Sequence, residues 1–66
     1  MIVFVNGERR EVAGPVTLDQ VLGLGGKAPR GFAVALDGAV VPRAKHQTTI
    51  LDEGARVEIV TAVQGG

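Results

Sequence analysis

Two tight-turn dipeptides constrain the fold of this sequence more than any other feature. Asn6-Gly7 and Asp37-Gly38 each follow a short run of strand-forming residues. Asn, Asp and Gly tolerate the positive φ angles that a two-residue type I′ hairpin needs at both central positions. The sequence therefore predicts two β-hairpins, over residues 2–13 and 32–41.

One short helix is predicted between the hairpins. Thr17 can cap its N-terminus, and Gln20, three residues later, can complete a capping box. Glycines from Gly23 onward should end the helix within about two to three turns, because an interior glycine costs about 1 kcal/mol. The apolar residues of this segment have the i, i+3, i+4 spacing of a buried stripe: Leu18, Val21 and Leu22.

Five strands surround this helix in the expected order β, β, α, β, β, β. Pro42 should end the fourth strand, since it has no N–H to donate to a ladder. The polar segment Arg43 to Thr49 is expected to form a loop or a single helical turn, and Asp52 to Ala55 a turn. The expected strands are Ile2–Val5, Glu8 to about Ala13, Phe32–Leu36, Ala39–Val41 and Arg56 to about Thr61.

A single helix can cover only one face of such a sheet, so the other face is left open to solvent or partners. The order suits a β-grasp (ubiquitin-like) roll of the α+β class. We expect a mixed four- to five-stranded sheet with one helix packed on one face, because a ferredoxin-like fold would need a second helix.

Composition limits what this domain can do. Its 66 residues form one small domain, and with 45% hydrophobic residues but no Cys, Trp or Tyr its core must be mainly aliphatic. Seven basic residues balance seven acidic ones, so nucleic-acid binding is not expected. No apolar stretch approaches the roughly 18 residues of a membrane span, and the N-terminus lacks the basic region of a signal peptide. We therefore expect a cytoplasmic protein with no membrane contact.

Candidate catalytic groups are few. The sequence has neither Ser nor Cys, the two commonest nucleophiles of covalent catalysis. His46 is the only histidine, and a structural role is favoured over metal binding because no soft ligands accompany it. Asp52 and Glu53 are adjacent carboxylates in a predicted turn, where solvation is more typical than a catalytic pair. The glycine-rich segment Gly23 to Lys27 lacks Walker spacing and is expected to end the helix.

Several segments give the chain a resemblance to a known family. They are Asp37-Gly38, Val41-Pro42-Arg43, Asp52-Glu53-Gly54 and the final run from Arg56 to Gly66, which ends Ala-Val-Gln-Gly-Gly. With these features the whole chain resembles the sulfur carrier proteins of thiamine biosynthesis, a bacterial β-grasp family. The sequence departs from the family pattern at Glu53-Gly54-Ala55, where family members often have Asp-Gly-Asp, and at His46, which stands at a position commonly held by Trp.

The resemblance implies a carrier and not an enzyme. An E1-like adenylating enzyme would use ATP and Mg²⁺ to activate the carboxylate of Gly66, and a sulfur donor protein would convert it to a thiocarboxylate. Thiazole synthase would then receive the sulfur, and this chain would bind no cofactor or metal itself. Residues 1–62 would be the β-grasp domain and residues 63–66 a flexible reactive tail. Gln64 and Gly65 would give access, since glycine allows close approach to another backbone.

The open sheet face is the expected partner-binding surface. If Val57 and Ile59 face the helix, alternation along the strand directs Val60 outward. The same alternation turns Ala33 and Ala35 outward, and the resemblance places Val3 and Val5 inside with Phe4 outside. The residues expected to bind partners are Phe4, Ala33, Ala35, Val60, Ala62 and Val63.

Three other functions remain open at this point. The same chemistry would serve the small subunit of molybdopterin synthase, although the short length and the Ala-Val-Gln-Gly-Gly ending favour the thiamine branch. A ubiquitin-like modifier would join Gly66 to lysines of target proteins. A β-grasp interaction module with an inert tail is the third. In each case we expect the isolated chain to be a monomer.

Overall fold

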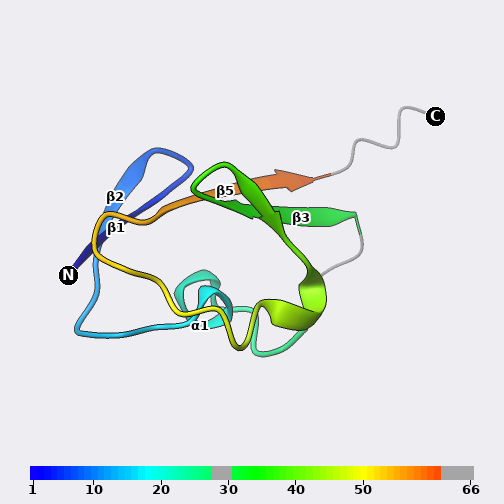
Figure 1. The fold of residues 1–66 in the computed structure, drawn as a ribbon, viewed down its shortest axis with the longest axis horizontal. Helices are drawn as coiled ribbons and strands as arrows, with labels where there is room; N and C mark the ends of the chain where they lie inside the picture. Colours follow the sequence, from blue (N-terminus) through cyan, green and yellow to red (C-terminus); the bar gives the residue numbers. More distant parts are fainter. Residues whose placement is uncertain (28–30, 62–66) are drawn as a thin grey trace.

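A five-stranded mixed sheet with one short helix on one side forms the domain (Figure 1). The computed structural model describes residues 1–27 and 31–61. The strand order is β2-β1-β5-β3-β4, in which β1 and β5 are parallel and the other neighbours antiparallel. This arrangement confirms the predicted β-grasp roll. The elements are β1 (Ile2–Val5), β2 (Glu8–Glu11), α1 (Leu18–Leu22), β3 (Phe32–Leu36), β4 (Ala39–Val41), the 3-10 helix η1 (Arg43–Lys45) and β5 (Arg56–Thr61).

Both predicted hairpins are present. Asn6 and Asp37 have positive φ angles of 51° and 49°, and the glycine after each is also positive, as a type I′ turn requires. The β2 strand ends at Glu11 and not near Ala13 as predicted. Its ladder with β1 closes at the bond from the Val12 N–H to the Met1 carbonyl oxygen (2.9 Å), after which the chain leaves the sheet.

The helix begins and ends as predicted. Thr17 Oγ1 accepts the Gln20 N–H at 3.1 Å, and Gln20 Oε1 accepts the Thr17 N–H at 2.9 Å, which completes the capping box. Gly23 adopts the left-handed conformation (φ 67°) and its N–H bonds to the Asp19 and Gln20 carbonyls. Because this cap follows directly, α1 has only five residues, within the expected limit of two to three turns.

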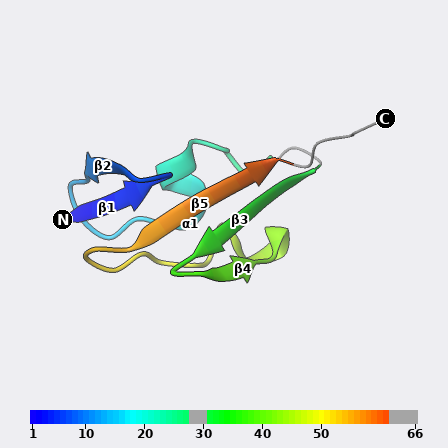
Figure 2. The same cartoon turned by 90° about the horizontal axis from the view of Figure 1, so that it is seen from above.

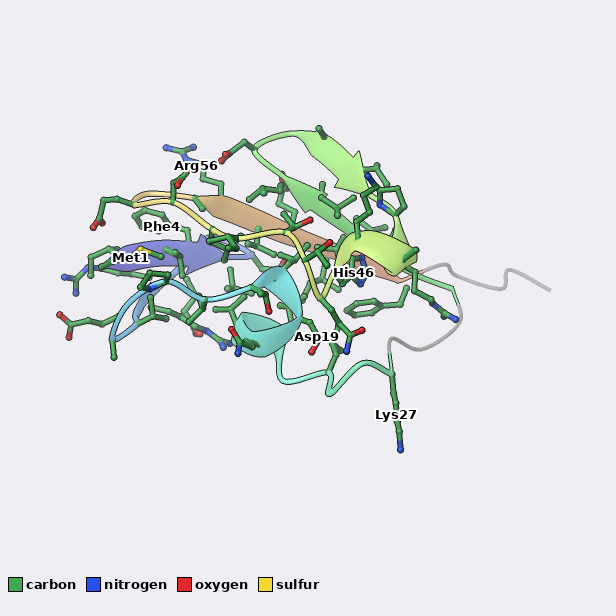
Figure 3. The ribbon with its side chains drawn as sticks, turned by 60° about the horizontal axis from the view of Figure 1, so that its bottom comes forward. Met1, Phe4, Asp19, Lys27, His46 and Arg56 are labelled. Carbon is green, nitrogen blue, oxygen red and sulfur yellow. The ribbon has the colours of Figure 1, made fainter. Side chains whose placement is uncertain are left out.

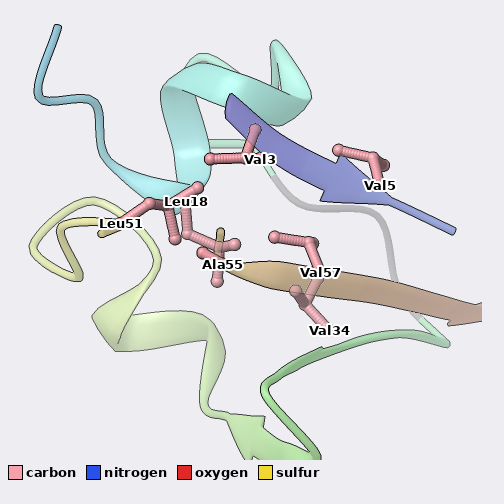
Figure 4. Close-up of a cluster of buried hydrophobic side chains, with 7 residues drawn as sticks. All are labelled: Val3, Val5, Leu18, Val34, Leu51, Ala55 and Val57. Carbon is pink, nitrogen blue, oxygen red and sulfur yellow. The ribbon is translucent and has the colours of Figure 1, made fainter. Parts of the chain in front are cut away.

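The core lies between the helix and the covered face of the sheet (Figure 4). Val34 and Val57, placed inside by strand alternation, and Val3 and Val5, placed inside by the family resemblance, are all buried. The segment before β5 contributes two core residues that the sequence did not predict, including one from the expected turn at residues 52–55. The buried cluster is Val3, Val5, Leu18, Val34, Leu51, Ala55 and Val57.

Candidate functional site

An exposed apolar patch lies on the open face of the sheet. Ala33 of β3 pairs with Val60 of β5, and Ala35 pairs with Val40 of β4. Because paired residues share a face, these four side chains lie together across three strands. Val60 is 61% exposed and Val40 is 71% exposed. We call Ala33, Ala35, Val40 and Val60 the outer patch; the sequence prediction had missed Val40.

Phe4 lies apart from the outer patch. In the parallel ladder Phe4 pairs with Arg56, and Glu58 follows Arg56 on the same face of β5, opposite Ala35. These two charged residues therefore stand between Phe4 and Val60. Phe4 and Val60, both expected on the open face, are therefore not neighbours, because β1 aligns with the start of β5 and not with its end.

A shallow hollow marks the Phe4 end of this face. It has a volume of about 380 Å³ and is lined by Phe4, Gly7, Arg56, Val57 and Glu58. Phe4 is half-buried, and Figure 3 shows it near Arg56 on the same side of the molecule. The hollow thus combines an aromatic side chain with two charged ones of opposite sign.

The outer patch lies at the end of the sheet from which the chain continues toward Gly66. Thr61, the last described residue, pairs with Phe32, directly after the Val60–Ala33 pair. The five residues after Thr61 span at most about 18 Å when extended. The candidate residues Ala62, Val63, Gln64, Gly65 and Gly66 lie outside the described part of the chain.

His46 is a buried structural residue. Only 3% of it is exposed, and its ring Nε2 lies 3.0 Å from the Val41 carbonyl oxygen. Its Nδ1 has no hydrogen-bond partner among the described residues. Within residues 1–27 and 31–61, no three His, Asp or Glu side chains gather in a way that could hold a metal ion.

The glycine-rich segment after α1 is folded around a buried carboxylate. Asp19 is 7% exposed, and its Oδ2 accepts the Gly26 N–H at 2.9 Å. Gly26 has φ +81°, and a Cβ there would stand 2.6 Å from Gln47 Nε2. The burial of Asp19 was not predicted from the sequence. The segment serves the helix end, as expected.

The remaining charged candidates have structural contacts or stay exposed. Glu53 Oε2 accepts the Ile2 N–H at 2.8 Å and so holds the start of β1, while Asp52 is exposed. Arg56 and Arg43 are exposed, and the described residues contain one salt bridge, between Arg10 and Glu8. No helix in the described ranges has the length and hydrophobicity needed to cross a membrane.

A mixed sheet with a parallel β1–β5 pair, one helix behind it and an exposed apolar face before the C-terminal residues defines a ubiquitin-like β-grasp domain. Residues 3–66 match the ThiS family. The chain therefore belongs to the ThiS family, and the resemblance to the sulfur carriers of thiamine biosynthesis is confirmed.

Solved structures of ThiS proteins agree with this fold. The crystal structure of a thiamine biosynthesis protein (ThiS) from Geobacter metallireducens superposes with a TM-score of 0.78 and 28% identity, over all of both chains. The solution structure of a thiamine biosynthesis protein from the same organism gives a TM-score of 0.68 and 27% identity, covering this whole chain and 88% of the other.

A thiazole synthase of Paramagnetospirillum magneticum is also related. It is 30% identical to this chain over all 66 residues. The match spans only 20% of that protein, so the chain corresponds to about one fifth of its curated relative.

Proposed function

We propose that this chain is a sulfur carrier for thiazole formation in thiamine biosynthesis, with the C-terminal carboxylate of Gly66 as the group that carries sulfur. The observation that carries the proposal is the family match, which extends over residues 3–66 and so includes the Gly-Gly ending. The chain would act as a co-substrate of partner enzymes and not as a catalyst. The proposed use of ATP fits a cytoplasmic location.

The proposed chemistry begins with activation of the carboxylate. An α-carboxyl group is ionised at neutral pH, so its oxygen can attack the α-phosphorus of ATP and release pyrophosphate. Sulfide-level sulfur (HS⁻) supplied by a donor protein then attacks the acyl carbon; the new C–S bond replaces the C–O bond to AMP, which leaves, and loss of the proton gives the thiocarboxylate. The Mg²⁺ and the cationic groups that stabilise the phosphate charge would come from an E1-like adenylating enzyme.

The outer patch is the proposed docking surface for these partners. Its two alanines allow close approach, while Val40 and Val60 offer large exposed apolar side chains. A patch at the end of the sheet nearest the C-terminal residues would hold them within about 18 Å of the docked surface. The relative named thiazole synthase supports thiazole synthase as one partner, because a fifth of its length matches this chain.

An intact-mass measurement tests the proposal. The chain is incubated with ATP, Mg²⁺, the adenylating enzyme of its source and a sulfur donor. Replacement of one oxygen by sulfur is expected in the wild-type chain, and deletion of Gly66 should abolish it while the circular dichroism spectrum stays the same.

The same measurement, followed by assays of sulfur transfer from the loaded chain to an acceptor, distinguishes the alternatives. Attachment of the chain to lysines of other proteins would indicate a ubiquitin-like modifier. Normal sulfur transfer to the Gly66-deleted chain would contradict the assignment of the chemistry to this terminus. Transfer of sulfur to a molybdopterin precursor and not to thiazole synthase would place the carrier in the other pathway.

A further inference from the structure

On its β1 side, the β5 strand extends beyond the end of its partner strand. Figure 2 shows β5 running past the end of β1, with β3 along its other side. The β1–β5 pairing covers only Phe4–Arg56 and Val5–Val57, whereas β3 pairs with β5 as far as Thr61. The C-terminal half of β5 therefore has a ladder on one side only.

Asn6 ends the β1 side of this ladder. Its N–H bonds to the Val57 carbonyl oxygen at 2.8 Å, and its side-chain Oδ1 accepts the Ile59 N–H at 2.8 Å. The chain then turns away at the left-handed residues Asn6 and Gly7 toward β2. The Asn6 side chain thus takes the place of a backbone acceptor for the Ile59 N–H, because the β1 backbone has already turned away at this point.

The next backbone groups of β5 on this side have no such partner. Val57 and Ile59 direct their backbone groups toward β1, so alternation directs the Ile59 C=O and both backbone groups of Thr61 the same way. No residue in ranges 1–27 and 31–61 bonds to them from this side. Just before the five C-terminal residues, β5 therefore offers the Ile59 carbonyl oxygen as an acceptor and the Thr61 N–H as a donor, at the spacing of a strand edge.

The other sheet edges are less suited to a partner strand. The free edge of β2 carries four exposed charged residues, Glu8 to Glu11, a composition that discourages edge pairing. The free edge belonging to β4 has three residues and stops at Pro42, which has no N–H. Within residues 1–27 and 31–61, the β5 edge combines open backbone groups with a neighbouring hollow, the one lined by Phe4 and Gly7 where β1 turns away.

We propose that the adenylating enzyme adds an extended segment of its own chain to this edge, as a strand paired with Ile59 and Thr61 of β5. The inference rests on the proposed function, since this enzyme must hold the residues after Thr61 in an extended path to reach Gly66. Backbone pairing at Thr61 fixes that path at its start. An apolar side chain of the added segment would enter the hollow beside Phe4.

Amide hydrogen exchange tests the pairing with a matched pair of residues. The Thr61 N–H points to the open edge, whereas the Val60 N–H points to β3. On binding the adenylating enzyme, exchange at Thr61 should slow by roughly tenfold or more, the factor that corresponds to about 1.4 kcal/mol for a gained hydrogen bond. Exchange at Val60 should already be slow in the free chain and change little.

A pair of variants gives a second readout. Thr61→Pro removes the N–H that β3 does not use, while Thr61→Val keeps it. Affinity for the enzyme should fall by roughly 3- to 10-fold in Thr61→Pro and stay within about twofold of wild type in Thr61→Val. Unchanged amide shifts in β3 would establish that the proline variant is folded.

The outcomes separate this inference from the proposed function. Sulfur incorporation into the wild-type chain with an unprotected Thr61 amide in the complex overturns the strand pairing alone. Protection of Thr61 that rises with concentration of the chain alone indicates pairing between two copies and also overturns it. If no sulfur is incorporated and no complex forms, both proposals fail.

Discussion

His46 joins β4 to α1 through two hydrogen bonds. Its ring Nε2 lies 3.0 Å from the Val41 carbonyl oxygen, and its own carbonyl accepts the Asp19 N–H at 2.9 Å. A carbonyl oxygen can only accept, so Nε2 must carry the hydrogen. The opposite nitrogen is buried without a partner among the described residues, which gives His46 a defined tautomer and a fixed orientation.

We therefore expect His46 to be the Nε2–H tautomer in the folded chain. Two-bond ¹⁵N–¹H correlation spectra distinguish the two ring nitrogens, and Nδ1 should show the shift of an unprotonated nitrogen. Urea-unfolded protein serves as the control, since both tautomers exchange there. A spectrum with the hydrogen on Nδ1 would contradict the observed hydrogen bond to Val41.

At the scale of elements, α1 depends on its caps. Five residues are too few for a helix to be stable on its own, because isolated helices shorter than about 12 residues are marginal. The capping box of Thr17 and Gln20, the left-handed Gly23 and the burial of Leu18 together hold it against the sheet. The domain is small, so each such contribution is a large share of its stability.

Replacement of the helix cap should measurably destabilise the domain. Thr17→Ala removes the acceptor for the Gln20 N–H and should cost about 1 kcal/mol. For a domain of this size, that cost lowers Tm by roughly 4–8 °C. The matched control is Gln20→Glu, which preserves a capping box and should unfold within about 0.5 kcal/mol of wild type in urea. Equal stability of Thr17→Ala and wild type would contradict the role given to the cap.

At the scale of the whole molecule, the large exposed apolar side chains among the described residues lie in two places. Val40 and Val60 belong to the outer patch on the sheet. Ile50 lies in the segment between η1 and β5, where it bridges to Thr17 beside α1. Ile50 and Val60 are each 61% exposed, so they form a matched pair for testing which surface the partners use.

Substitution in this pair should separate docking from stability. Val60→Lys should weaken binding to the adenylating enzyme by at least roughly tenfold, because a central apolar contact is lost and a charge must be desolvated. Ile50→Lys should leave affinity within about twofold. Both variants should unfold near the wild-type urea midpoint, since each side chain is exposed. An equal loss of affinity in the two variants, measured by calorimetry, would rule out the outer patch as the docking surface.

The sequence by itself determined the features that depend on neighbouring residues. The Asn6-Gly7 and Asp37-Gly38 turns follow from local φ preferences, and the Thr17–Gln20 cap from a spacing of three residues. Alternation along each strand correctly assigned Val34 and Val57 to the core. The assignment of the sulfur chemistry to Gly66 stays a prediction from the family resemblance.

The tertiary structure decided how these local pieces align. The pairing of Val5 with Val57, 52 positions apart in the sequence, separates Phe4 from Val60 and leaves the end of β5 open. The β3–β4 register brings Val40 into the outer patch, and packing buries His46 and Asp19. No pattern within a strand or helix carries this information, because register and burial arise from contacts between segments distant in sequence.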